Sequence, residues 1–288
     1  MVNAMKRKKP DALLKGWVEL SSLPFIYIKI NDAINDRRCS IKDISEIISS
    51  DPSLTARLLR LVNSAFYSFP YKVDSVSRAI LTVGTNQIRD LALATSVLRL
   101  FKGIPAGLVS MESLWKHSVA CGVAAKLLAT AGGRRANVER FFTAGIIHDI
   151  GRLAIYKMMP QAAQDMILRC RISNEPLSVV EREVIGFDHS DFGRALAQLW
   201  NLPEILEDII AYHHTPADAR EHPFDAHIIH MADHVVQEME MGDSGEQYLP
   251  TLDKKVYRIT GVPEGILPTI AEPLKAGFEE VVRSLWDL

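Results

Sequence analysis

The sequence predicts an all-α protein built as a multi-helix bundle. Apolar residues recur at intervals of three and four positions along most of the chain, as in residues 41–48 and 54–62, and this spacing places side chains on one face of a helix. A sustained alternation of apolar and polar residues, which would indicate β-strands, does not occur in the sequence. Hydrophobic residues make up 48% of the 288 positions, which is enough to fill a sizeable core.

Capping residues mark the first helices. Ser40, followed three residues later by Asp43, fits a capping box, in which each side chain bonds to the backbone of the other residue. Asp51 precedes Pro52, a pair that places an N-cap before a first-turn proline. Gly84 can end the helix that begins near residue 76. These signals predict an N-terminal unit of several short helices.

A break in the helical pattern at residues 103–107, which contain two glycines and a proline, predicts a boundary near residue 106. The expected organisation is a tail or leading helix at 1–19, an N-terminal helical subdomain at 20–106, a second helical subdomain at 107–241, and terminal helices that pack on the body at 242–288. Helices in the second subdomain are expected near 110–131, 138–148, 152–173, 178–186, 189–200, 203–213 and 224–240, and Ser178 with Glu181 fits another capping box.

Charge and composition exclude some partners. The formal net charge of −2 provides no overall cationic field, so we expect no nucleic-acid partner, and the basic run at residues 6–9 is expected to be a solvated tail. No apolar stretch approaches the ~20 residues that a membrane span needs, so we expect no membrane partner and a cytoplasmic location. Cys39, Cys121 and Cys170 are odd in number and lack a Cys-x-x-Cys pair, so they indicate buried thiols and neither disulfides nor a thiolate zinc site.

An ordered series of histidines and aspartates predicts a metal centre. Histidine nitrogens and carboxylates are ligands that divalent transition metals prefer, and iron, manganese, nickel and zinc are the candidates. Residues 141–151 show the apolar surroundings in which an unpaired carboxylate or imidazolium would be costly to bury. A hydrogen-bonded core network without metal remains the alternative. The candidate ligands for one or two ions are His117, His148, Asp149, His189, His213, His214 and Asp233.

Several segments resemble the HDOD family, the HD-related output domains of bacterial signalling proteins. The resemblance covers roughly residues 20 to 240. It implies an all-α fold whose second half is similar to the HD superfamily of metal-dependent phosphohydrolases, with a helical bundle as the first half. The segments that carry it are DPSLTARLLRLVNSA at 51–65, SVSRAI at 75–80, HDIGR at 148–152, GFDH at 186–189, WNLP at 200–203 and YHHTP at 212–216.

The HD superfamily pattern of a histidine, a His-Asp pair and a distal aspartate matches His117, His148-Asp149 and Asp233 in order. The extra histidines, His189, His213 and His214, resemble the enlarged ligand set of the HD-GYP branch, which hydrolyses cyclic di-GMP. The chain departs from that branch because it lacks Gly-Tyr-Pro, has Thr215 after the paired histidines, and has Arg152 where the branch has lysine. The resemblance to the HD-GYP branch therefore does not imply that this chain hydrolyses cyclic dinucleotides.

Helical geometry suggests how these ligands divide. Adjacent helical residues project about 100° apart, so Asp149 can bridge two ions. His117, His148 and Asp233 would complete a first site, and the other three histidines a second site at the ~3.5–4 Å separation of two-metal hydrolases.

Two functions remain open. The first is a regulatory HDOD protein of bacterial signal transduction, which acts on an unidentified signalling protein or a small phosphate-containing ligand and has a metal centre. The second is a metal-dependent phosphohydrolase acting on a nucleotide or related phosphoester. In the second, Asp149 and Arg152 are the catalytic candidates, and Arg152 would contact a phosphate oxygen. The sequence does not indicate an oligomeric state.

Overall fold

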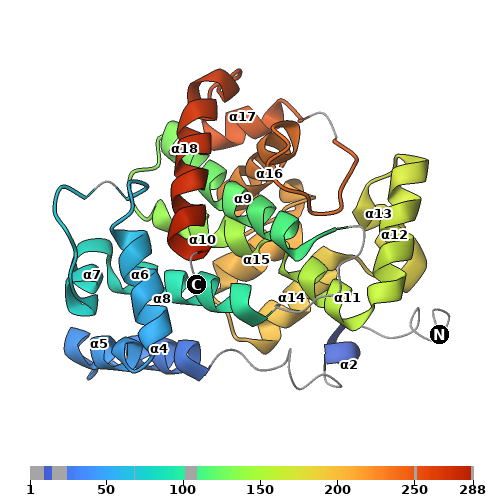
Figure 1. Cartoon of the computed structure of the whole chain (residues 1–288). Coiled ribbons are helices and arrows are strands. Elements are labelled where there is room, and N and C mark those ends of the chain that lie inside the picture. The colour runs from blue at the N-terminus through green and yellow to red at the C-terminus, as the bar shows by residue number, and fades with distance from the viewer. Residues whose placement is uncertain (1–9, 15–24, 68, 101–108, 250–251, 287–288) are drawn as a thin grey trace. The chain divides into compact units, whose positions relative to one another are not determined.

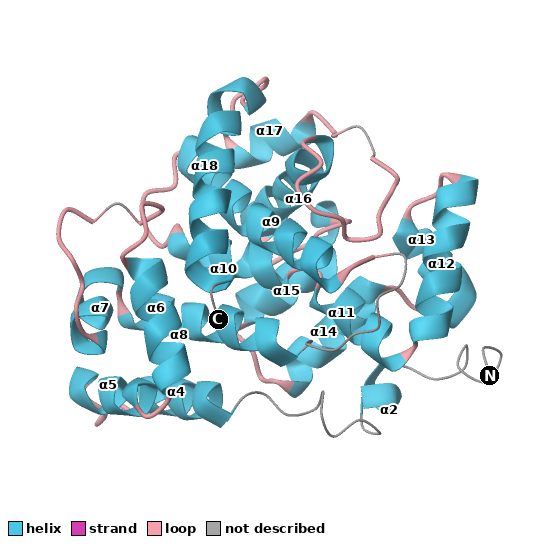
Figure 2. Ribbon diagram, viewed as in Figure 1, coloured by secondary structure: helices cyan, strands magenta, loops and turns pink. Residues whose placement is uncertain are grey.

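The computed structural model describes residues 10–14, 25–67, 69–100, 109–249 and 252–286. Figure 2 shows that this part of the chain consists of helices joined by loops, with no strand. The predicted all-α fold is confirmed. Within the same ranges, no helix combines the length and the apolar character needed to cross a membrane. The basic run at 6–9 and the boundary predicted near 106 lie outside the described residues.

The helices form two compact units (Figure 1). One unit contains α2 and α9–α17, and the other contains α4–α8 and most of the C-terminal helix α18 (Leu267–Trp286). The four-part organisation expected from the sequence stays a prediction. Every candidate ligand lies in the first of these units, which we call the ligand unit.

The unit that contains α4–α8 begins its helices where the capping residues predict. Ser40 and Asp43 form the predicted capping box, and the Asp51 side chain accepts a hydrogen bond from the backbone N–H of Leu54. Gly84, at a φ of 103°, ends α7 as expected. The helices are α4 (Phe25–Asn35), α5 (Ile41–Ser49), α6 (Pro52–Val62), α7 (Val76–Val83) and α8 (Thr85–Leu100).

The ligand unit is a bundle in which α9 packs against both α10 and α16, and α14 packs against both α11 and α15. Two sequence predictions are wrong here. The helix expected at 152–173 is divided at Met159, because Pro160 cannot donate a backbone hydrogen bond and clashes with the preceding turn. Ser178 and Glu181 do not form a capping box, because α13 already begins at Leu177 and has no side-chain cap. The elements are α2 (Pro10–Leu14), α9 (Met111–Ala131), α10 (Glu139–Ile147), α11 (Ile150–Met158), α12 (Pro160–Ser173), α13 (Leu177–Ile185), α14 (His189–Leu199), α15 (Glu204–Tyr212), a 3-10 turn at Pro216–Asp218, α16 (Pro223–Glu238) and α17 (Lys255–Thr260).

Glycines allow the helices of this bundle to approach closely. A Cβ at Gly145 of α10 would lie 2.6 Å from the Cα of Gly122 in α9, so the two backbones touch at this crossing. A Cβ at Gly151 of α11 would overlap the carbonyl oxygen of His189 at the start of α14. The first crossing brings His117 close to His148, with ring centroids 5.5 Å apart. The second crossing brings α14 against the start of α11.

Candidate metal centre

The structure brings all seven predicted ligands together in two adjacent groups within the ligand unit. In each group, one possible ligand atom from every member lies within 4.8 Å of those of the others. The first group consists of His117, His148 and Asp233 with Cys121, and the second group consists of Asp149, His189, His213 and His214. Their role as metal ligands stays a prediction.

The first group joins α9, α16 and the junction between α10 and α11. His117 Nε2 lies 3.2 Å from Asp233 Oδ1, and the Gln237 side chain donates to the same oxygen at 2.9 Å. Cys121 Sγ lies 3.5 Å from His117 Nε2. From the sequence, Cys121 was expected only to be a buried thiol. Its spacing four residues after His117 was the signal that it shares a helix face with that histidine.

The Asp149 carboxylate lies between the two groups. Its Oδ2 is 3.5 Å from His148 Nε2 and 3.9 Å from His117 Nε2, on the side of the first group. Its Oδ1 is 3.5 Å from the Nε2 atoms of both His189 and His213, in the second group. Each carboxylate oxygen therefore faces a different set of imidazoles, as a bridging ligand does.

A buried glutamate fixes the second group. Glu181 Oε2 accepts from the backbone N–H of His189 at 2.9 Å and from His189 Nδ1 at 2.6 Å. The other ring nitrogen of His189 lies 2.8 Å from His214 Nε2. The sequence did not predict this role of Glu181, because its position near a helix start suggested a capping residue. Only the fold shows that it faces His189, eight residues away.

Several ligand atoms have no hydrogen-bond partner. His148 Nδ1 donates to the Gly145 carbonyl at 2.7 Å and His213 Nδ1 donates to the Ile210 carbonyl at 2.9 Å, so each ring directs its Nε2 into the centre. Among the described residues, these Nε2 atoms and Asp149 Oδ2 have no partner, although all three are buried. A metal ion would satisfy them, and a backbone bond at the opposite ring nitrogen is the usual support of a metal-binding histidine. The residues present therefore fit a metal.

The electrostatics around His148, Asp149 and Asp233 favour the forms that bind metals. Burial lowers the pKa of His148 to about 4, so its imidazole is neutral near pH 7. Burial alone would raise the pKa of Asp149, but the positive charge of Arg152 holds it well below its usual range. Burial also opposes ionisation of Asp233, yet the hydrogen bond with His117 lowers its pKa. Neutral imidazoles and ionised carboxylates are the states that coordinate metals.

Arg152 is fully buried beside the second group. Its Nε donates to Asp149 Oδ1 at 3.0 Å, and its Nη1 donates to the Ser244 carbonyl at 3.2 Å. Its Nη2 lies 3.3 Å from His214 Nε2. The predicted contact with a phosphate stays a prediction, and in this structure the guanidinium bonds to groups of the protein itself. The sequence does not mark Ser244 as a partner of Arg152, since 92 positions separate the two residues.

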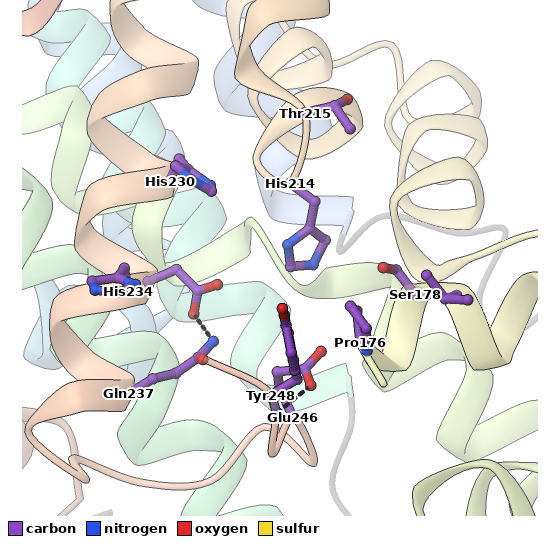
Figure 3. A pocket seen from close by; sticks show the side chains of 11 residues that line it. Pro176, Ser178, His214, Thr215, His230, His234, Gln237, Glu246 and Tyr248 are labelled. Atoms are coloured by element: carbon purple, nitrogen blue, oxygen red, sulfur yellow. Dashed lines mark hydrogen bonds between the residues drawn. The ribbon is translucent and has the colours of Figure 1, made fainter. Parts of the chain in front are cut away.

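A pocket of about 250 Å³ opens beside both groups. It is lined by Asp233 of the first group and His214 of the second. Figure 3 shows the His214 ring between two walls, one carrying His230 and His234 and the other carrying Pro176 and Ser178. None of the described residues that line it is Lys or Arg. The pocket therefore offers a small molecule a route to both groups, but supplies no fixed positive charge of its own.

The chain is similar to several known proteins. A family model described as HDOD domain matches residues 20–216. An uncharacterised protein of Treponema pallidum is 26% identical over 262 residues, which cover 91% of this chain but 50% of that protein. The chain thus spans about half the length of this curated relative.

Two solved structures have similar folds. An HDOD domain protein of unknown function from Geobacter sulfurreducens superposes with a TM-score of 0.73 at 23% identity, and the match covers 90% of this chain and 92% of that one. A Shewanella amazonensis protein named "Putative phosphohydrolase" superposes with a TM-score of 0.72 at 26% identity, covering 95% of this chain and 97% of that one. The first of these shows the fold alone.

Proposed function

Because the chain belongs to the HDOD domain family, we propose that it is a regulatory protein of bacterial signalling that binds a divalent transition metal in its ligand unit. It acts through a signalling protein or a small phosphate-containing ligand. A cytoplasmic location stays a prediction.

The observation that carries the proposal is the set of unpartnered atoms at the centre of the ligand unit. His148 Nε2, His213 Nε2 and Asp149 Oδ2 are buried side by side without hydrogen bonds among the described residues. Each unsatisfied buried polar group costs about 1–3 kcal/mol, and the cost is larger for a charged one. A core network without metal would carry that cost at three neighbouring atoms, whereas a bound cation removes it.

The first group is the better candidate for the metal-binding site. His117, His148 and Asp233 would supply two nitrogens and an oxygen, and Asp149 would add its Oδ2. Iron, manganese, nickel and zinc all accept such a mixed set. A bound ion supplies a positive charge that links three helical segments, and coupling of this kind between binding and folding is common in metal sites.

Metal content tests the proposal. Tag-free protein should contain at least one of the four metals per chain by inductively coupled plasma mass spectrometry. His148→Ala and Asp149→Ala should lose it while circular dichroism shows them folded. His222→Ala, a histidine outside both groups, should keep the wild-type content and serves as the matched control. A folded wild type that contains no metal and takes up none of the four when they are added contradicts the proposal.

A metal-dependent phosphohydrolase is the second candidate, and the pocket in Figure 3 favours it because His214 and Asp233 both line it. The name of the Shewanella relative points the same way. A bound divalent ion would supply the positive charge that the pocket lacks and could acidify a water molecule. Asp149 would hold and orient that ion, and Arg152 would stabilise the ionised form of Asp149 from its buried position.

A turnover screen separates the two functions. Mononucleotides, dinucleotides and cyclic dinucleotides would be incubated with the protein in added manganese or iron. Hydrolysis products, separated by chromatography, that disappear in Asp149→Ala support the enzyme. No hydrolysis of any of these compounds by metal-loaded protein favours the regulatory function.

A further inference from the structure

The second group has the composition of a second metal site. A carboxylate oxygen of Asp149 and one nitrogen from each of three histidines lie within 4.8 Å of one another. Beside a filled first group, such a set would ordinarily hold the second ion of a two-metal centre, in which the ions lie about 3.5–4 Å apart.

The Arg152 guanidinium is already hydrogen-bonded to atoms of this group that would bind a second ion. Asp149 Oδ1 accepts from Arg152 Nε at 3.0 Å, and His214 Nε2 lies 3.3 Å from Arg152 Nη2. A guanidinium has only donors, so His214 must use the lone pair of its Nε2 to accept this bond. Two of the four atoms that would face a second ion are therefore hydrogen-bonded to an arginine.

His189 is occupied as well. Its Nδ1 faces the Glu181 carboxylate at 2.6 Å, which can only accept. Its Nε2 lies 2.8 Å from His214 Nε2, whose lone pair faces Arg152, so His189 is the donor in this contact too. Within the second group, His213 Nε2 and Asp149 Oδ2 are the buried side-chain atoms that lack a hydrogen-bond partner among the described residues, and Oδ2 faces the first group.

Arg152 is held in place from the opposite side. Its Nη1 donates to the Ser244 carbonyl at 3.2 Å, and Tyr156 donates to the same carbonyl at 2.8 Å. Glu246 Oε2 lies 4.0 Å from Arg152 Nη2 and accepts from the backbone N–H of Leu177 at 2.9 Å. The side chain is completely buried. These contacts hold the guanidinium on the side opposite Asp149 and His214.

We infer that the metal centre holds a single ion in the first group, and that the Arg152 guanidinium takes the place of the second ion. This inference rests on the proposed metal-binding function. It gives the Asp149 carboxylate two different cations, a metal at Oδ2 and an arginine at Oδ1. An arginine is always charged and cannot bind water as a metal does, so the centre lacks the paired ions that two-metal hydrolases use.

The experiment compares metal content after reconstitution with excess Mn(II) and removal of free metal. Arg152→Met keeps much of the length of the side chain and removes its charge, and Arg152→Lys keeps the charge. We expect Arg152→Met to hold about one ion more per chain than wild type, and Arg152→Lys to hold the wild-type number. Electron paramagnetic resonance should show isolated Mn(II) in wild type and a spin-coupled pair in Arg152→Met.

The difference in metal content between Arg152→Met and wild type tests the inference. The metal content of wild type by itself tests the proposed metal-binding function. Folded Arg152→Met with the wild-type content overturns the inference, and so does a spin-coupled pair in wild type. His214→Gln keeps Arg152 in place and covers the case in which Arg152→Met does not fold. This variant should retain the ion of the wild type, and loss of that ion overturns the inference.

Discussion

The Asp149 carboxylate connects the two groups through its two oxygens. Oδ2 faces the histidines of the first group, and Oδ1 accepts a hydrogen bond from Arg152 at 3.0 Å. Because the guanidinium holds the pKa of this carboxylate well below its usual range, Asp149 is ionised near pH 7, which is the form that a metal would need. The ionised state of Asp149 therefore depends on Arg152, three residues later in the chain.

His148 makes the stability of the metal-free protein depend on pH. Burial lowers its pKa from 6.5 to about 4. The unfolded chain therefore takes up a proton between these values that the folded chain does not, and the free energy of unfolding falls as the pH drops from about 6.5 to 4. The contribution is on the order of 3 kcal/mol. Urea denaturation of chelator-treated wild type and His148→Asn measures it. The variant should show a shallower slope against pH, and identical slopes contradict the prediction.

Residue types and the family resemblance were enough to select the candidate ligands, but not the residues that contact them. The ordered histidines and aspartates, together with the family resemblance, identify all seven residues that the structure brings together. Cys121 could have been added from its helical spacing with His117. The roles of Glu181 and Ser244 could not, because they depend on tertiary contacts between segments far apart in the sequence, and no local pattern marks such contacts.

At the scale of the helices, close crossings determine where the ligands meet. His148 lies three residues after Gly145, and His117 lies five residues before Gly122 in the helix that Gly145 touches. A side chain at the crossing would separate α9 from α10 and move the two imidazoles apart. The glycines therefore serve the site as well as the packing.

Gly145→Ala tests this crossing. The added methyl would meet the backbone of Gly122 at 2.6 Å, and overpacking of this kind costs about 1–3 kcal/mol. We expect lower stability and a lower metal content, measured by urea denaturation and mass spectrometry. Gly133→Ala is the control, because no atom lies within 4 Å of its Cβ and only its left-handed backbone opposes the change, at about 1–2 kcal/mol. Gly145→Ala that keeps the full metal content would contradict the role of the crossing.

The helices themselves were predictable where local chemistry decides them. The Ser40–Asp43 box and the Asp51 cap lie where the sequence places them, because a cap depends on residues within one turn. The break at Met159 was missed, although Pro160 was a visible signal for it. The capping box at Ser178 was wrong because Pro176 starts the helix earlier, which leaves Glu181 free to bind His189.

At the scale of the whole molecule, the candidate metal centre lies within one of the two units. The ligand unit contains both ligand groups and the pocket, whereas α4–α7 contribute no member to either group. Metal binding should therefore stabilise the ligand unit and leave the stability of the other unit unchanged. A ligand that binds only the folded state stabilises it by an amount that grows with its free concentration.

Hydrogen exchange followed by mass spectrometry tests this division. At a free metal concentration about a hundred times the Kd, linkage predicts about 2.7 kcal/mol of added stability. Peptides from α9, α10 and α16 should gain protection, because these helices and the junction after α10 carry the first group. Peptides from α4–α7 should exchange at the metal-free rate. In the His148→Ala variant, added metal should not change the hydrogen-exchange rate of peptides from either unit. Equal added protection in both units would mean that they unfold together, and that metal binding stabilises the chain as one cooperative body.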